Sequence, residues 1–165
     1  MKNLTFVFCI LVSGILTSQD ISFTNKENQS QSVIFVNGEY LQNGLAYTGK
    51  YTIYFDNGKI KEEFNIKDGK LNGSYVKNHE NGTKMDVGSY ENNLKFGLWS
   101  RYSINGKLIA QASYANDKKD GNWYVYNEEG NKLFEMIYKD GEKTGIWKQW
   151  DENGKLLTSI DYSSM

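Results

Sequence analysis

The stretch YTGKYTIYFDNGKIKEEFNIKDGK, residues 47–70, sets the architecture, because its pattern returns every 24 residues as far as residue 165. Its first glycine series is Gly49, Gly73, Gly97, Gly121 and Gly145. A second series follows nine residues behind it, at Gly58, Gly82, Gly106, Gly130 and Gly154. Ten of the 16 glycines thus fall on two positions of one period, which indicates tandem repeats with structural glycines. Residues 49–165 are predicted to be five 24-residue repeats.

The segments between the glycines are rich in aromatic and β-branched residues and contain no proline, which favours β-strands. Asn precedes the second glycine in four of the five repeats, as in Asn57-Gly58. This dipeptide supplies the positive φ angles of a two-residue type I′ turn. Each repeat is therefore predicted to be a β-hairpin.

Counting outward from such a turn gives the cross-strand register. One face receives large residues opposite small or apolar ones: Tyr51 with Phe64, Tyr75 with Gly88, Trp99 with Ala112, Trp123 with Met136 and Trp147 with Ile160. The same face carries a column that runs through Ile66, Tyr90, Tyr114, Tyr138 and Tyr162. We expect this to be the core face.

A second aromatic column lies five residues after the first glycine of each repeat. Strand alternation sends it to the opposite face. The predicted pairs there are Asn78 with Met85, Tyr102 with Ile109, Tyr126 with Leu133 and Trp150 with Leu157. Tyrosine and tryptophan are enriched on binding surfaces. We therefore predict that an extended partner binds Tyr54, Tyr102, Tyr126 and Trp150.

The N-terminus has the order of a secretory signal: Lys2, an apolar run over residues 4–16, and small polar residues up to Ser18. Cleavage is predicted near Ser18, with an uncleaved N-terminal anchor as the alternative. Residues 19–32 are interpreted as a polar leader that need not be ordered. Residues 33–48 are expected to form N-terminal strands that lead into the repeats.

The protein is therefore expected to be secreted or periplasmic. Removal of residues 1–18 takes away Lys2 and the single cysteine, and leaves 18 basic and 20 acidic side chains. Without a thiol the mature chain has no disulfide, Cys nucleophile or thiolate metal site. Its weak net charge of −2 gives no reason to expect nucleic acid. Membrane contact stays open as an alternative that the charge does not support.

The residues quoted above, with the motifs Asp56-Asn57-Gly58-Lys59 and Lys67-Asp68-Gly69-Lys70, resemble the bacterial MORN-repeat-variant family, which includes YwqK-type antitoxins. The resemblance covers roughly residues 38–165. It implies an all-β, elongated, twisted antiparallel β-meander of hairpin repeats, and an antitoxin- or immunity-like role. Repeats two and three depart from the pattern: Asn78 replaces an aromatic residue, Gly88 an apolar one, and Asn93 and Asp117 replace the glycine seen at Gly69 and Gly141.

No constellation for catalysis or metal binding is found. His79 is the only histidine and is interpreted as a solvated turn residue. Most carboxylates lie at turns, where solvent keeps them ionised, so paired acid and base roles are not favoured. The segment 116–120 lacks the ligand pattern of a calcium loop. We therefore expect no enzyme activity, metal or cofactor.

The predicted function is a non-catalytic protein-binding or scaffolding module whose partner is another protein or an envelope component. Two alternatives stay open. One is an enzyme that acts on cell-envelope glycans through paired carboxylates. The other is a choline- or cell-wall-binding repeat protein, since segments such as Gly121-Asn122-Trp123-Tyr124 resemble its aromatic cages. The sequence does not indicate the oligomeric state.

Overall fold

The computed structural model describes residues 21–23 and 32–163, so the predicted signal segment 1–18 lies outside the described residues. A small sheet contains β1 (Ile21–Phe23), β2 (Val33–Val36), β3 (Glu39–Gln42) and β4 (Leu45–Ala46). The large sheet contains β5 (Gly49–Tyr54), β6 (Ile60–Lys67), β7 (Lys70–Asn78), β8 (Lys84–Glu91), β9 (Leu94–Tyr102), β10 (Leu108–Ala115), β11 (Lys118–Tyr126), β12 (Lys132–Lys139), β13 (Glu142–Trp150) and β14 (Leu156–Asp161).

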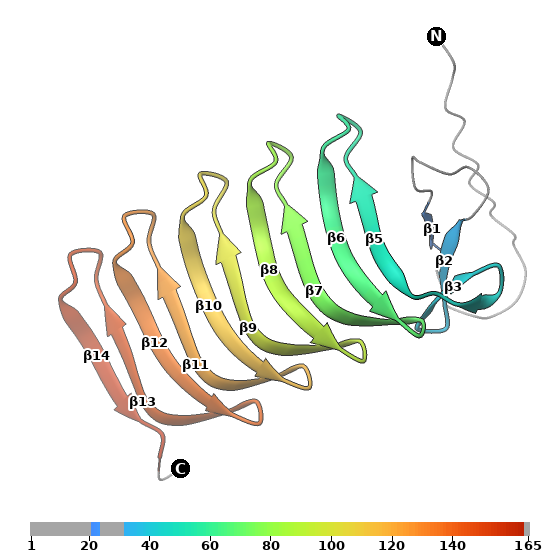
Figure 1. Ribbon diagram of the computed structural model, residues 1–165. Helices are drawn as coiled ribbons and strands as arrows, with labels where there is room; N and C mark the ends of the chain where they lie inside the picture. The colour runs from blue at the N-terminus through green and yellow to red at the C-terminus, as the bar shows by residue number, and fades with distance from the viewer. Residues whose placement is uncertain (1–20, 24–31, 164–165) are drawn as a thin grey trace, which may run out of the picture.

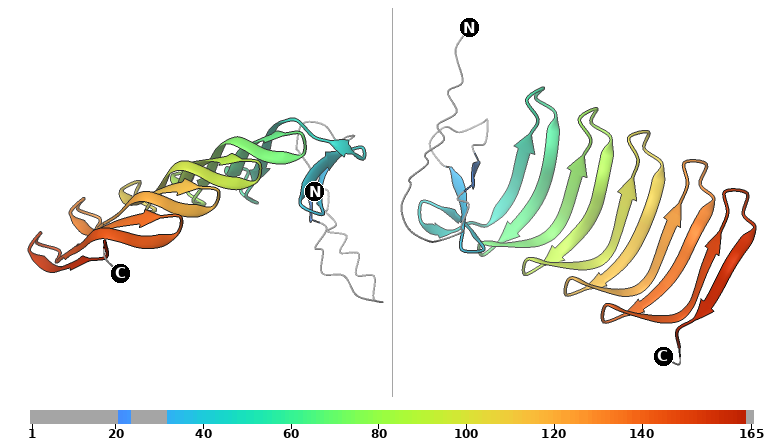
Figure 2. Two further views of the ribbon diagram at one scale, coloured as in Figure 1. Left: turned by 90° about the horizontal axis from the view of Figure 1, so that it is seen from below. Right: turned by 180° about the vertical axis from the view of Figure 1, so that it is seen from behind.

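Both sheets are antiparallel meanders, and the ten strands of the large sheet are the five predicted hairpins laid side by side (Figure 1). The all-β repeat fold is confirmed. Strand β1 lies within the segment interpreted as a polar leader and pairs with β2. In the described part of the chain, no helix has the length and apolar character needed to cross a membrane. Figure 2 shows the elongated shape that results, with the small sheet at the N-terminal end.

The turns within the repeats differ from the predicted type. Gly58 N–H donates to Phe55 O at 2.9 Å, and Phe55 N–H donates to Lys59 O at 2.8 Å, so three residues form the loop. Gly58 has φ of 81°, whereas Asn57 is not among the residues with positive φ. This is a type I turn followed by a glycine in a G1 bulge. The prediction of a type I′ turn at this position is therefore wrong.

The two-residue type I′ turns lie at the other end of the strands, between repeats. Asp68-Gly69 joins β6 to β7, and both residues have positive φ. The equivalent turns are Asn92-Asn93, Asn116-Asp117 and Asp140-Gly141. The substitutions of glycine by Asn93 and Asp117 therefore keep residue types that tolerate this backbone conformation.

A second bulge restores the predicted register further from the turn. Tyr54 pairs with Ile60 but Ile53 pairs with Glu62, so Lys61 is the extra residue. The three-residue loop alone would shift the cross-strand pairing by one residue from that of the predicted two-residue turn. The bulged residue Lys61 cancels this shift. All five predicted pairs of the core face, from Tyr51 with Phe64 to Trp147 with Ile160, are confirmed.

The predicted pairs next to the turns are wrong, because they lie between the turn and the second bulge. The observed pairs there are Asn78 with Lys84, Tyr102 with Leu108, Tyr126 with Lys132 and Trp150 with Leu156. Each partner is displaced by one residue from the predicted one.

The fully packed core occupies the N-terminal end of the large sheet. Val33, Tyr51, Phe64 and Ile66 are 2–4% exposed and form one cluster, against which Tyr40 packs. Backbone hydrogen bonds fix the small sheet there: Tyr40 N–H donates to Gly69 O at 2.7 Å and Gly69 N–H donates to Tyr47 O at 2.9 Å. We call the predicted core face of the whole large sheet the aromatic face. The small sheet covers the part of this face that belongs to repeat one.

Candidate functional site

The aromatic face continues past the small sheet as a column of ring contacts. Tyr75 and Trp99 have ring centroids 5.5 Å apart, and Trp99 and Tyr114 lie 6.4 Å apart. A second run has centroid distances of 5.0–5.7 Å and joins Trp123, Tyr138, Trp147 and Tyr162. Trp99 is 8% exposed, whereas the rings of the second run are only half-buried. Burial falls because the large sheet is a single layer beyond the small sheet (Figure 1).

Lysines lie over these rings wherever the second layer is missing. The position two residues before the first glycine of each repeat holds Tyr47, Leu71, Lys95, Lys119 and Lys143. Tyr47 and Leu71 pack against the buried cluster. In the last three repeats the position is lysine, and each ammonium lies over one tryptophan and one tyrosine.

The lysine–ring geometry repeats with the sequence. The distances from Nζ to the indole centroid are 4.3 Å for Lys95 over Trp99, 3.2 Å for Lys119 over Trp123 and 4.5 Å for Lys143 over Trp147. The distances from Nζ to the tyrosine centroid are 5.2, 4.7 and 5.1 Å, for Tyr114, Tyr138 and Tyr162. Desolvation lowers the pKa of Lys119. Each of the last three repeats thus presents a cation held between two aromatic rings.

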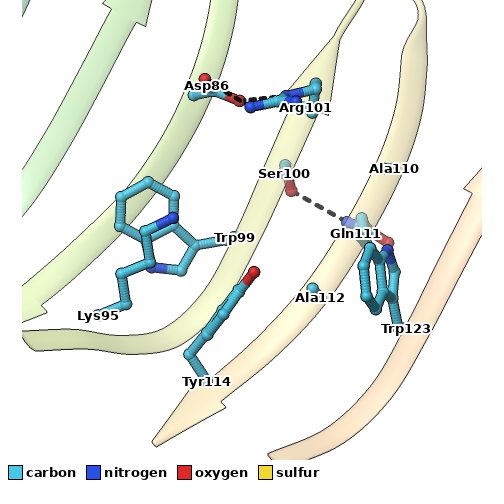
Figure 3. Close-up of a pocket in the computed structure, with 10 residues that line it drawn as sticks. All are labelled: Asp86, Lys95, Trp99, Ser100, Arg101, Ala110, Gln111, Ala112, Tyr114 and Trp123. Atoms are coloured by element: carbon cyan, nitrogen blue, oxygen red, sulfur yellow. Dashed lines mark hydrogen bonds and ion pairs between the residues drawn. The ribbon is translucent and has the colours of Figure 1, made fainter. Parts of the chain in front are cut away.

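A hollow interrupts the aromatic column between Tyr114 and Trp123, which make no ring contact in the described part of the chain. Its volume is about 280 Å³, and its lining includes Trp99, Tyr114 and Trp123 as well as Ala110 and Ala112 of β10. Figure 3 shows Ala112 lying between the side chains of Trp99 and Trp123. The hollow exists because two consecutive positions on this face carry alanine where the neighbouring strands carry larger residues.

An ion pair forms one rim of the hollow. Arg101 Nε donates to Asp86 Oδ1 at 2.7 Å and Arg101 Nη2 donates to Asp86 Oδ2 at 3.2 Å, and this hydrogen bonding raises the pKa of Arg101. The two residues are also directly paired across β8 and β9. Asp86 is the only carboxylate among the residues that line the hollow. A lone carboxylate bound to a guanidinium does not form the pair of contrasting acids that glycoside hydrolysis needs.

A second hollow continues the surface toward the small sheet. It has a volume of about 450 Å³, and its lining includes Phe35, Tyr40, Leu71 and Tyr90. Lys95 lines both hollows, so they adjoin at this residue. Together they give the aromatic face two adjoining concavities.

The predicted binding residues lie on the other face, as strand alternation requires. Tyr54 is 38% exposed, and Tyr102, Tyr126 and Trp150 are half-buried. The rings of Tyr124 and Tyr126 lie 6.3 Å apart. Lys132 lies 5.7 Å from the centroid of Trp150 and pairs with Glu135 at 2.7 Å. The four predicted residues form one stripe across the sheet, but they do not line either of the two hollows.

His79 is more constrained than the sequence suggests. It is half-buried, and its Nε2 lies 3.0 Å from the backbone oxygen of Tyr102 in the next repeat. It therefore ties two turns together and is not simply a solvated residue. In the described residues, no group of three His, Cys, Asp or Glu side chains is placed to hold a metal ion.

The candidate site residues that the sequence pattern did not identify are the three lysines. A signal was available, because their position changes from Tyr and Leu to Lys at the third repeat. The hollow could not be found in the same way. It depends on whether rings from neighbouring strands meet above two alanines.

The repeats match the model of one known family, the MORN repeat variant. The matched segments are residues 47–68, 119–140 and 143–163, which begin two residues before the first glycine of repeats one, four and five. These segments are MORN repeat variants, as the sequence pattern predicted. Repeats two and three, which carry the departures at Asn78 and Gly88, are not among the matched segments. No curated protein matches the sequence.

Proposed function

We propose that this MORN-repeat-variant protein is a non-catalytic binding or scaffolding module that holds an extended protein partner along its aromatic face. The observation that carries the proposal is the half-buried run of Trp123, Tyr138, Trp147 and Tyr162, which no second layer covers. Aromatic side chains that are rigid and partly exposed supply large contact areas at small conformational cost. The adjoining hollow over Ala110 and Ala112 would receive an apolar side chain of the partner.

The proposed location is the periplasm or the extracellular space. It is supported by the charged, apolar and small-residue order of residues 1–18. The absence of cysteine after residue 18 is compatible with an oxidising compartment. An immunity-like role against a secreted toxin fits both this location and the family of YwqK-type antitoxins. We propose it as the more specific form of the binding function.

The two alternatives have less support. A choline-binding cage needs free aromatic faces, but Trp99, Trp123 and Trp147 each already have a lysine ammonium over the ring. A glycan-acting enzyme needs two carboxylates across a cleft, and each of the two hollows has a single carboxylate in its lining, Asp86 or Asp117.

The test is to block each face separately. Ala110→Arg places a long side chain in the hollow on the aromatic face. The triple change Tyr102→Ser, Tyr126→Ser and Trp150→Ser removes most of the aromatic stripe on the opposite face. Each purified protein is immobilised, and the proteins captured from an envelope extract are quantified by mass spectrometry. Circular dichroism and the melting temperature establish that both variants fold.

We expect Ala110→Arg to remove a partner that the wild-type protein and the triple variant both retain. Loss of the partner only with the triple variant would show that the partner binds the opposite face. If no protein is captured differently by any folded variant, the binding proposal is wrong. Hydrolysis of envelope glycan by the wild-type protein would likewise overturn it.

A further inference from the structure

We infer that the partner segment is a polyproline II helix with an acidic side chain at every third residue, which lies across β9–β14 and over the three lysines. This inference rests on the proposed binding function and specifies the chemistry of its partner. It is carried by the charge of the aromatic face and by the spacing of Lys95, Lys119 and Lys143.

The aromatic face has cations without counter-charges. In the described part of the chain, the ammonium groups of Lys95, Lys119 and Lys143 make no ion pair within 4.0 Å. Carboxylates on this face are already engaged: Glu62 with Lys77 at 3.3 Å and Asp86 with Arg101 at 2.7 Å.

Asp117, at a neighbouring turn, and Asp120, within β11, are engaged as well. Asp117 Oδ1 accepts a hydrogen bond from Lys95 N–H at 2.6 Å. Asp120 Oδ2 accepts one from Lys139 Nζ at 2.9 Å. The row of three ammonium groups therefore complements a row of negative charges supplied by another molecule.

The spacing of the lysines selects the conformation of that molecule. Equivalent residues of successive repeats are two strands apart, which is about 9.6 Å because neighbouring strands lie about 4.8 Å apart. A polyproline II helix rises about 3.1 Å per residue with three residues per turn, so its residues i and i+3 share one side at about 9.3 Å. An extended strand places side chains on one side about every 6.7 Å, which does not match the lysines.

The rings between the lysines suit the same occupant. Polyproline II segments dock in grooves lined by aromatic side chains, and they lose little conformational freedom on binding. Trp99 and Trp123 stand on either side of Ala112 in Figure 3, and Ala110 also lines the hollow. A proline ring that enters this hollow would leave the neighbouring acidic residues directed at Lys95 and Lys119.

The experiment uses three synthetic ten-residue peptides and isothermal titration calorimetry. The first has glutamate at positions 1, 4, 7 and 10 and proline elsewhere. The second has the same composition with glutamates at positions 1, 3, 5 and 7. The third replaces the glutamates of the first with glutamine. We expect the first peptide to bind at least about ten times more tightly than either of the others, and its affinity to fall as salt is added.

Protein variants locate the site. Lys119→Gln with Lys143→Gln should weaken the first peptide about threefold to tenfold for each lysine and make binding less sensitive to salt. Lys148→Gln is the matched control, because Lys148 pairs with Glu135 and Ser159 on the opposite face and should leave affinity unchanged. The melting temperature of each variant verifies the fold.

Equal affinity for the first two peptides would overturn the polyproline II spacing, and equal affinity for the first and third would overturn the acidic requirement. If none of the peptides binds but Ala110→Arg still removes a captured partner, this inference fails and the binding function stands. If the peptides bind but Ala110→Arg removes no captured partner, the peptide chemistry stands without evidence for a protein partner.

Discussion

The indole of Trp99 lies directly against the backbone of Gly88 on the neighbouring strand. A Cβ atom built on Gly88 would overlap three atoms of the Trp99 side chain. The indole nitrogen also donates to Ser89 O at 3.1 Å, which fixes the ring in this place. The sequence predicted Tyr75 as the cross-strand partner of this glycine. Tyr75 is its cross-strand partner, but the space that a side chain would need is occupied by Trp99.

Gly88→Ala should therefore destabilise the fold. The added methyl group forces the indole of Trp99 out of its position, and such overpacking costs about 1–3 kcal/mol. Urea unfolding followed by tryptophan fluorescence measures the loss. The double variant Gly88→Ala with Trp99→Phe should recover part of it, because the smaller ring leaves room for the methyl group. Full stability of Gly88→Ala alone would contradict this account.

Asn81→Ala should weaken the contact between successive turns. Asn81 Nδ2 donates to Ile104 O at 3.0 Å, and its Oδ1 accepts from Thr83 N–H and Thr83 Oγ–H at 3.0 and 2.7 Å. The loss of these exposed hydrogen bonds should cost about 1 kcal/mol and lower the melting temperature. Asn105 occupies the same turn position in the next repeat and its side chain makes no hydrogen bond in the described part of the chain, so Asn105→Ala is the control and should change little. Equal effects of both changes would show that the turn, not the contact between turns, needs asparagine.

Asn93→Gly should loosen the attachment of the small sheet. Asn93 Oδ1 accepts from Leu71 N–H at 2.7 Å, and Asn93 Nδ2 donates to Gly38 O at 3.0 Å. Glycine keeps the positive φ of the turn but removes both bonds, at a cost of about 1–2 kcal/mol. Hydrogen exchange should become faster in β2 and β3. Asn92→Gly, in the same turn, is expected to be neutral, and if it accelerates exchange equally the effect belongs to the turn itself.

Stability should fall above pH 10. Burial raises the pKa of Tyr40 and of Tyr51 from the ordinary value of 10.0 to about 12. Below pH 10 both phenols are protonated in the folded and unfolded chains, so their contribution is fully present. Between pH 10 and pH 12 the unfolded chain loses these protons first, and unfolding is favoured by up to about 1.4 kcal/mol per pH unit for each phenol.

Urea unfolding at pH 8, 10 and 11 measures this dependence. Tyr40→Phe removes one of the two phenols and should make the slope between pH 10 and pH 11 shallower than that of the wild-type protein. An unchanged slope in Tyr40→Phe would contradict the assignment of the effect to this residue.

The period and the face of each strand residue could be predicted because both depend on local regularities. Glycines at a fixed spacing identify the hairpins, and alternation along a strand assigns Tyr51 and Tyr54 to opposite faces. The turn type was predicted wrongly because Asn-Gly fits both a type I′ turn and a type I turn with a G1 bulge. The register beyond Lys61 was nevertheless correct, since the second bulge compensates for the odd loop.

The candidate site was less predictable. The stripe at Tyr54, Tyr102, Tyr126 and Trp150 stays a prediction, while the two hollows lie on the face expected to be buried. Exposure of that face depends on how far a second layer reaches, and the small sheet reaches only the first repeats.

The sequence by itself determined the repeat, its five hairpins and the pairing of Tyr51, Trp99 and Trp147 with their partners, because glycine spacing and strand alternation are properties of the local chain. Only the tertiary structure decided which of these aromatic residues are buried and which are half-exposed under lysine. Tyr51 and Trp147 occupy the same position in their repeats, yet Tyr51 is 2% exposed and Trp147 is half-buried. The physical reason is that burial requires a second surface, and the small sheet supplies it only at the N-terminal end.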